Sequence, residues 1–135
     1  MAAAFALGAE GIQMGTRFVS CTESPVHANY KTAIVEARET GTLVLNKKST
    51  PCIRALKSER TKAIYEEGVM APDALTGIRN LYFHGDMEAA PALAGQSAGL
   101  IDAVKPAAEI IEETVAEFFA IAGRLGGLAA TRTFG

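Results

Sequence analysis

The chain has 135 residues, of which 49% are hydrophobic and 21% charged, a composition typical of one globular unit rather than a disordered or fibrous chain. Thirteen basic and fifteen acidic side chains give a formal net charge of −2, which argues against a domain-wide basic field for nucleic acid or anionic lipid. Cys21 and Cys52 form no CxxC or Cys/His cluster, so neither a disulfide framework nor a zinc site is indicated, and a reducing compartment fits best.

The apolar N-terminal segment is not predicted to be a secretion signal, because it lacks a basic region and is interrupted at Glu10 and Gln13. No window of the chain approaches the ~20 apolar residues that a membrane span needs, so we expect a cytoplasmic protein. The alanine-rich stretch Ala2–Ala9 predicts the last turns of a helix that ends at Gly8. The glycine-flanked segment Gly11–Gly15 then predicts a short buried strand, which would make half of an α/β repeat.

The middle of the chain contains two helix patterns. Ser24 followed by Pro25 is a typical helix start, and apolar residues recur at helical spacing from Val26 to Ala37. The β-rich Thr42–Leu45 predicts a short strand. A second, amphipathic helix is predicted to end at Gly68, from the spacing of its apolar residues Leu56, Ile64 and Tyr65.

The C-terminal part carries the clearest helix pattern, from Pro106 to Ala122. Its apolar positions form one stripe that must cover another surface: Ala107, Ile110, Ile111, Val115, Phe118 and Ala122. The glycine-rich residues 123–135 are predicted to be a flexible tail.

The run from Ala6 to Ala37 resembles the region of the eighth strand in the FMN-dependent nitronate monooxygenases, formerly called 2-nitropropane dioxygenases, and in the related FMN-dependent enoyl-acyl-carrier-protein reductases. The resemblance continues, in the family's order, through Arg54–Lys57, His84–Asp86 and Ala94–Leu100. It extends from Ala3 to about Phe119.

The resemblance implies an α/β fold of the TIM (β/α)8 barrel type that binds FMN. Such a barrel typically needs ~250 residues, so this chain is expected to be a C-terminal fragment. It would hold the last strand and a C-terminal helical elaboration, and would be mostly helical as a separate chain. In domain terms, residues 1–122 would be the C-terminal portion of the barrel and residues 123–135 the tail.

The resemblance also implies cofactor-binding residues: the family contacts FMN through a Gln-x-Gly-Thr run, which here is Gln13, Met14, Gly15 and Thr16. In such barrels the loops after the seventh and eighth strands bind phosphate with backbone N–H groups. Without the resemblance, this run would be interpreted as a tight turn that needs Gly15 only for its backbone angles.

Gln96 and Ser97 lie in a small-residue segment, Gly95–Gly99, which resembles the part that these enzymes bring over the barrel mouth. They are therefore candidates for contact with the flavin edge or the substrate. Close packing of helices through small residues is the equally supported alternative.

No catalytic and no metal-binding residue is predicted in this chain. His27 and His84 match no catalytic histidine of the family, so capping or packing roles are expected for them. Cys21 and Cys52 are expected to be ordinary thiols. Arg54 is expected to be structural, anchoring its loop to the barrel through a carboxylate or carbonyl.

The leading hypothesis is an FMN-dependent oxidoreductase of the nitronate monooxygenase type. The chain would be an inactive fragment of this enzyme. FMN and a small nitronate or enoyl substrate would bind to the intact enzyme. The amino-acid sequence of Gly95–Leu100 is slightly more similar to the monooxygenases. A fragment of an enoyl-acyl-carrier-protein reductase is the alternative. A non-enzymatic helical remnant that self-associates, or pairs with a missing N-terminal part, is an alternative of another class.

Overall fold

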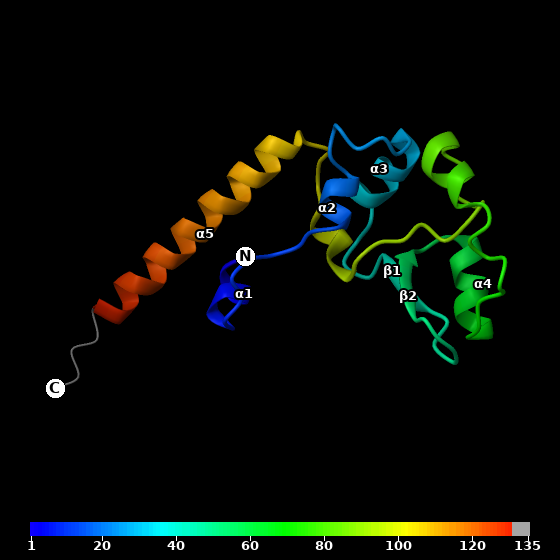
Figure 1. Cartoon of the computed structure of the whole chain (residues 1–135), viewed down its shortest axis with the longest axis horizontal. Coiled ribbons are helices and arrows are strands. Elements are labelled where there is room, and N and C mark those ends of the chain that lie inside the picture. The colour runs from blue at the N-terminus through cyan, green and yellow to red at the C-terminus, as the bar shows by residue number, and fades with distance from the viewer. Residues whose placement is uncertain (131–135) are drawn as a thin grey trace. The chain divides into compact units, whose positions relative to one another are not determined.

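The computed structural model describes residues 1–130, which divide into two compact units (Figure 1). The first unit joins residues 1–14 to the segment that begins at Pro106, and the second unit is Gly15–Lys105. Among the described residues, more lie in helices than in strands, as the sequence predicts. Among residues 1–130, we find no helix that combines the length and the hydrophobicity of a transmembrane segment.

The first unit consists of helices α1 (Ala2–Ala6) and α5 (Ala107–Ala130). Gly8 follows the end of α1 with a φ of +95°, which confirms its predicted role in ending the helix. The rings of Phe5 and Phe118 pack against each other with centroids 4.9 Å apart. This aromatic contact joins the two helices of the unit.

Helix α5 begins after Pro106 as predicted, but it continues beyond Ala122 to Ala130. Residues 123–130, the first part of the expected tail, are therefore helical, and residues 131–135 lie outside the described part of the chain. The predicted apolar stripe is only partly covered: Ile110 is buried, whereas Ile111 and Val115 are 52% and 39% exposed.

The prediction of a strand at Gly11–Gly15 is wrong. Residues 11–14 are irregular and Gly15 lies in a bend. A strand needs a neighbouring strand to accept and donate its backbone hydrogen bonds. Among the described residues, the sheet contains only the antiparallel pair formed by residues 42–45 and 53–56, so this segment has no neighbour to pair with.

In the second unit, α2 (Thr16–Val19) precedes α3 (Ala28–Val35). The predicted helix start at Ser24 and Pro25 is wrong, because α3 begins after His27. The backbone N–H of His27 donates to the carbonyl of Tyr82, and its Nδ1 atom accepts from the backbone N–H of Asn29 at 3.1 Å. A tertiary contact and a histidine cap therefore set this helix start.

Strands β1 (Thr42–Leu45) and β2 (Ile53–Leu56) form an antiparallel hairpin with Thr42 opposite Leu56. Strand β1 is confirmed. Leu56, however, belongs to β2 and not to the following helix as predicted. The backbone N–H of Leu56 donates to the carbonyl of Ala92 at 2.8 Å, so a distant extended segment fixes it in the strand.

Helix α4 (Glu59–Glu67) ends at Gly68 as predicted, with Gly68 at a φ of +77°. It starts with a capping box, in which the Ser58 hydroxyl accepts from the backbone N–H of Thr61, and the Thr61 hydroxyl accepts from the backbone N–H of Ser58. The smaller of the unit's two apolar clusters includes Leu45, Ala55 and Ile64, which come from the hairpin and from this helix.

The larger core of the second unit combines α3 with the π-helix η1 (Asn80–His84) and the 3-10 helix η2 (Gln96–Leu100). Tyr30 is its largest fully buried side chain. The Tyr30 ring stacks on Tyr82, and its hydroxyl donates to the carbonyl of Leu93. Tyr30 therefore ties η1 and the segment before η2 to α3.

Replacing Tyr30 by Phe is expected to lower the free energy of unfolding by about 1–3 kcal/mol at neutral pH, because the partly buried Leu93 carbonyl loses its donor. Burial, with a smaller effect of the neighbouring Tyr82, raises the pKa of Tyr30 above its usual value. A raised folded-state pKa means that the contribution is complete below the unfolded pKa of about 10 and is lost as the pH rises above it. Urea unfolding at pH 7 and above pH 10 should show the difference between wild type and variant shrinking; an unchanged difference would contradict this.

Candidate functional site

The four residues predicted to bind FMN are divided between the two units, two residues in each. Gln13 and Met14 belong to the first unit, where Gln13 is exposed and Met14 partly buried in the irregular segment. Gly15 and Thr16 belong to the second unit, where Gly15 caps α2 and Thr16 is its first residue.

The start of α2 presents unused backbone donors. Within residues 1–130, the backbone N–H groups of Gly15, Thr16 and Arg17 donate no hydrogen bond, since the first bonds of the helix are made by Phe18 and Val19 to the Gly15 carbonyl. Gly15 is exposed, and a Cβ atom placed on it would meet no described atom within 4 Å. Free N–H groups at a helix start attract anions, so an anionic group could approach here.

The backbone angles of Gly15 correct the tight-turn interpretation. Gly15 has a φ of −88° and a ψ of −74°, in the right-handed helical region that any residue can adopt. Glycine is therefore not needed at this position for its conformation. What Gly15 provides is open space beside the α2 amides.

The Thr16 hydroxyl connects the two segments that were predicted separately to contact the cofactor. Its Oγ1 atom accepts a hydrogen bond from the backbone N–H of Gly95 at 2.8 Å. The next residues, Gln96 and Ser97, are exposed at the start of η2. Because Oγ1 acts as acceptor towards Gly95, the hydroxyl proton remains available to a second acceptor.

The other end of the Gly95–Gly99 segment has a packing role. Ala98 is fully buried, and a Cβ atom on Gly99 would lie 2.5 Å from the carbonyl carbon and oxygen of Arg38. Gly99 therefore allows two backbones to approach closely, as the packing alternative expected. Gln96 and Ser97 are exposed, so a ligand role for them stays a prediction.

Arg17 supports the start of α2, a role that the sequence did not indicate. Its Nη1 atom donates to the carbonyl of Ala103 at 2.8 Å and to the Ser20 hydroxyl at 3.2 Å. Ala103 is 86 residues away in sequence, so no local pattern could have revealed this contact. The guanidinium holds α2 against the segment that follows η2.

The histidines occupy structural or solvent positions. His27 caps α3, which confirms the expected capping role. His84 is exposed at the end of η1. Neither geometry indicates a general base.

The remaining residues singled out in the sequence also have structural surroundings. Cys21 is a buried free thiol and Cys52 an exposed one. The Arg54 guanidinium donates to the Thr42 hydroxyl at 3.0 Å. The acceptor that the described residues offer Arg54 is therefore a hydroxyl on the other strand of the hairpin, and the expected anchor to the barrel through a carboxylate or carbonyl stays a prediction.

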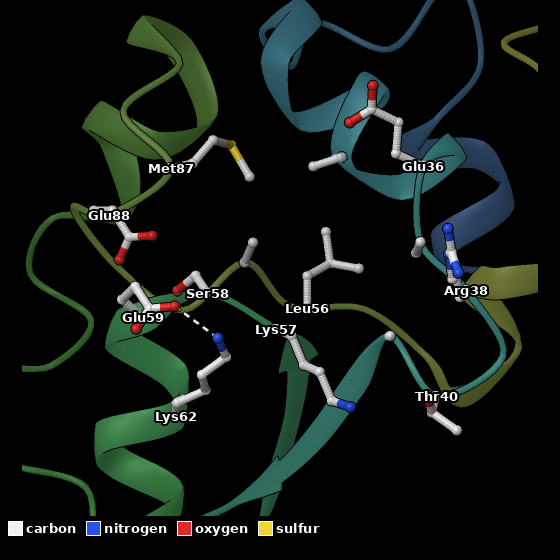
Figure 2. A pocket seen from close by; sticks show the side chains of 14 residues that line it. Glu36, Arg38, Thr40, Leu56, Lys57, Ser58, Glu59, Lys62, Met87 and Glu88 are labelled. Carbon is white, nitrogen blue, oxygen red and sulfur yellow. Dashed lines mark hydrogen bonds and ion pairs between the residues drawn. The ribbon is translucent and has the colours of Figure 1, made fainter.

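A pocket of about 640 Å³ lies entirely within the second unit (Figure 2). It is lined by the end of α3 and the loop after it, by the junction of β2 and α4, and by the segment before η2. Its charged lining residues are Glu36, Arg38, Lys57, Glu59, Lys62 and Glu88. No sequence pattern indicates this pocket, because three segments far apart in the chain form it.

Three of these charges already have partners. Lys62 Nζ and Glu59 Oε1 form an ion pair at 2.6 Å, and a Glu88 carboxylate oxygen accepts from the backbone N–H of Arg60 at 3.1 Å. The side chains of Arg38, Lys57 and Glu36 make no hydrogen bond or ion pair within the described residues. Because a backbone N–H does not neutralise the Glu88 carboxylate, the charges outside the ion pair are two cations, Arg38 and Lys57, and two carboxylates, Glu36 and Glu88, around an apolar floor that includes Leu56.

Comparisons with known proteins place the chain in a family. A sequence model of the nitronate monooxygenase family matches residues 1–117. A probable nitronate monooxygenase of Staphylococcus saprophyticus is 37% identical over 73 residues, which make up 54% of this chain and 21% of that protein.

Solved structures of FabK from Thermotoga maritima are also similar to this chain. One superposes with a TM-score of 0.87 and 41% identity, over 95% of this chain and 43% of FabK. A FabK mutant superposes with a TM-score of 0.82 and 42% identity, over 95% of this chain and 40% of the mutant. The chain thus spans less than half the length of each of these relatives. Since the family's sequence model covers most of its residues, the chain belongs to the nitronate monooxygenase family.

Proposed function

We propose that this chain forms the C-terminal part of an FMN-dependent (β/α)8 barrel of the nitronate monooxygenase type, and that it grips the FMN phosphate through the start of α2. The observation that carries the proposal is the group of three unused N–H donors on Gly15, Thr16 and Arg17. It lies within the residues that the family model matches. The overlap with 43% of FabK at a TM-score of 0.87 supports a role as part of a larger enzyme.

The residues present suit a phosphate group. The open space beside Gly15 admits the anion, the α2 amides donate to it, and the Thr16 hydroxyl proton supplies one more donor. Gln13 and Met14 stay proposed contacts on the strength of the family resemblance. When bound, FMN supplies the redox chemistry, and the protein's share is to bind and orient it.

The proposed reaction is the oxidative denitrification of alkyl nitronates with dioxygen. The 37% identity to the Staphylococcus saprophyticus protein, a probable nitronate monooxygenase, supports it. The second candidate is enoyl-acyl-carrier-protein reduction, favoured by the 41–42% identity to FabK. Residues outside this chain would decide between the two reactions in the intact enzyme.

A self-associating, non-enzymatic protein is the alternative of another class, and one observation favours it. Ile111, Val115 and Phe119 are exposed at i, i+4 and i+8 along one face of α5. Gel filtration with detection at flavin wavelengths separates the hypotheses. A yellow species supports the flavin enzyme, and a colourless oligomer supports self-association.

The isolated 135-residue chain is expected not to oxidise nitronates. Within the described residues His27 caps α3 and His84 is exposed at the end of η1, and the sheet is a two-stranded hairpin rather than a barrel. Oxygen uptake with propyl nitronate and added FMN should therefore equal that of an FMN blank. Steady uptake above the blank would show that the chain is active alone.

A chimera tests the phosphate role directly. The chain would replace the corresponding 43% of FabK from Thermotoga maritima, to which it is 41% identical there. The proposal expects a chimera that purifies with bound FMN. A folded chimera that binds no FMN, while FabK prepared in parallel retains it, would contradict the proposal.

A further inference from the structure

Helix α5 carries an exposed face without charge. The residues that share this face by helical spacing are all exposed: Ala108, Ile111, Val115, Phe119, Ala122 and Gly126. The acidic residues Glu109 and Glu113 lie on the opposite side of the helix. The uncharged face of α5 therefore has the composition of a packing surface and extends over about five turns.

Helix α1 packs on the neighbouring side of α5. The Phe5 ring contacts the Phe118 ring there, and Ile110, two turns before Phe118, is 2% exposed. The large side chains of the uncharged face, which are Ile111, Val115 and Phe119, are left 52%, 39% and 66% exposed. Contiguous exposed apolar side chains of this kind mark a surface that binds another one.

The same unit contains a stretch of backbone without hydrogen bonds. Within residues 1–130, no backbone N–H or carbonyl group of residues 10–14 makes a hydrogen bond. The edge of a β-sheet offers the donors and acceptors that such a stretch can pair with. A sheet would therefore satisfy both features of the first unit, because its edge can pair with residues 10–14 and its apolar side can be covered by α5.

The FabK comparison indicates what can supply that sheet. The superposition covers 95% of this chain, and so most of the first unit, but only 43% of FabK. In that relative, the matched part belongs to a longer chain. A second copy of this chain suits the role less well, because its described residues contain one hairpin, and the outer edge of β2 already pairs with residues 92–94.

We propose that the first unit is a docking surface for the sheet of a larger barrel portion. The uncharged face of α5 covers this sheet, and residues 10–14 pair with its edge strand. The occupant is a polypeptide segment equivalent to the part of FabK outside the superposed 43%. This inference rests on the barrel part of the proposed function and is independent of the phosphate grip.

Hydrogen exchange of backbone amides tests the pairing, in the isolated 135-residue chain and in the FabK chimera described above. The amides of residues 11–14 should exchange at close to the unprotected rate in the isolated chain, because they have no partner there. In the chimera they should exchange at least about a hundredfold more slowly. Equally fast exchange in both proteins would overturn the pairing.

A pair of charge variants tests the α5 face. Val115→Glu places a carboxylate on the uncharged face, and Ala120→Glu, on the opposite side of the helix and also exposed, is the matched control. In the isolated chain, both should leave the urea midpoint nearly unchanged, because both positions face water. In the chimera, Val115→Glu should lower the melting temperature by about 5 °C or more, since it buries an unpaired charge, and Ala120→Glu by less than about 2 °C. Equal shifts in the chimera would contradict docking through this face.

Two further outcomes would overturn the inference. If sedimentation shows that the isolated chain is a dimer and that Val115→Glu dissociates it, the occupant is a second copy. A chimera that does not fold, while FabK prepared in parallel does, would show that the two portions do not fit. A chimera that keeps the slow exchange and the Val115 effect but binds no FMN would instead contradict only the phosphate grip.

Discussion

Replacing Gly85 by Ala is expected to lower the free energy of unfolding of the second unit by about 2–4 kcal/mol, from backbone strain and overpacking together. Gly85 has a φ of +75°, which side chains other than glycine rarely adopt. A Cβ atom there would lie 2.2 Å from Nδ1 of His27. The His27 ring cannot easily move aside, because it caps α3, and the Asn29 side chain donates to the Gly85 carbonyl at 2.9 Å.

Gly68→Ala is the matched control for Gly85→Ala. Gly68 has nearly the same φ, +77°, but a Cβ atom there would meet only the outer part of the flexible Lys48 side chain, at 2.8 Å. Its cost should be the backbone part alone, about 1–2 kcal/mol. Urea unfolding of both variants measures the difference. Equal losses would show that the His27 ring yields and that the close contact with Gly85 carries no energy.

The elements predicted correctly are those whose signals are local. Helix α5 has a proline before its first turn and a periodic apolar stripe, and α4 has a glycine at its end. The boundaries of these helices depend on residues a few positions away, and such local patterns can be recognised in the sequence. The sequence prediction ends α5 too early because it treats Gly123, Gly126 and Gly127 as helix breakers, whereas each glycine costs a helix only about 1 kcal/mol.

The errors lie where distant residues decide the structure. Strand β2 was missed because its backbone is held by hydrogen bonds to residues 92–94 as well as by β1. The start of α3 is set by the contact of His27 with Tyr82, which no local pattern contains. Gly11–Gly15 carries a strand-like pattern, but it has no strand to pair with in the described part of the chain.

In the candidate phosphate segment, too, local features could be predicted from the sequence and contacts between distant residues could not. The resemblance pointed separately to Thr16 and to Gln96 and Ser97, and the structure joins the two segments through the bond from Gly95 to Thr16. The supporting contact of Arg17 with Ala103 and the pocket around Leu56 depend on pairs of residues far apart in sequence. Such arrangements become visible only once the chain is folded.

In the FabK chimera, variants of Thr16 measure how much its hydroxyl contributes to FMN affinity. Thr16→Ala removes one hydrogen bond to a charged group, worth about 1.5–3 kcal/mol, which corresponds to a ten- to hundredfold loss of FMN affinity. Thr16→Ser keeps the hydroxyl and should retain most of the affinity.

Gly15→Val is expected to weaken FMN binding at least as much as Thr16→Ala, by about ten- to a hundredfold or more. The Gly15 backbone angles suit any residue and its surroundings are open, so valine should leave the fold intact. Its side chain would instead occupy the space through which a phosphate reaches the α2 amides. Gly11→Val is the matched control, because a Cβ atom on Gly11 also meets no described atom within 4 Å. Quenching of FMN fluorescence measures the dissociation constants. If the Gly15 variant binds FMN as tightly as the Gly11 variant, residues 13–16 form a turn and do not bind the phosphate.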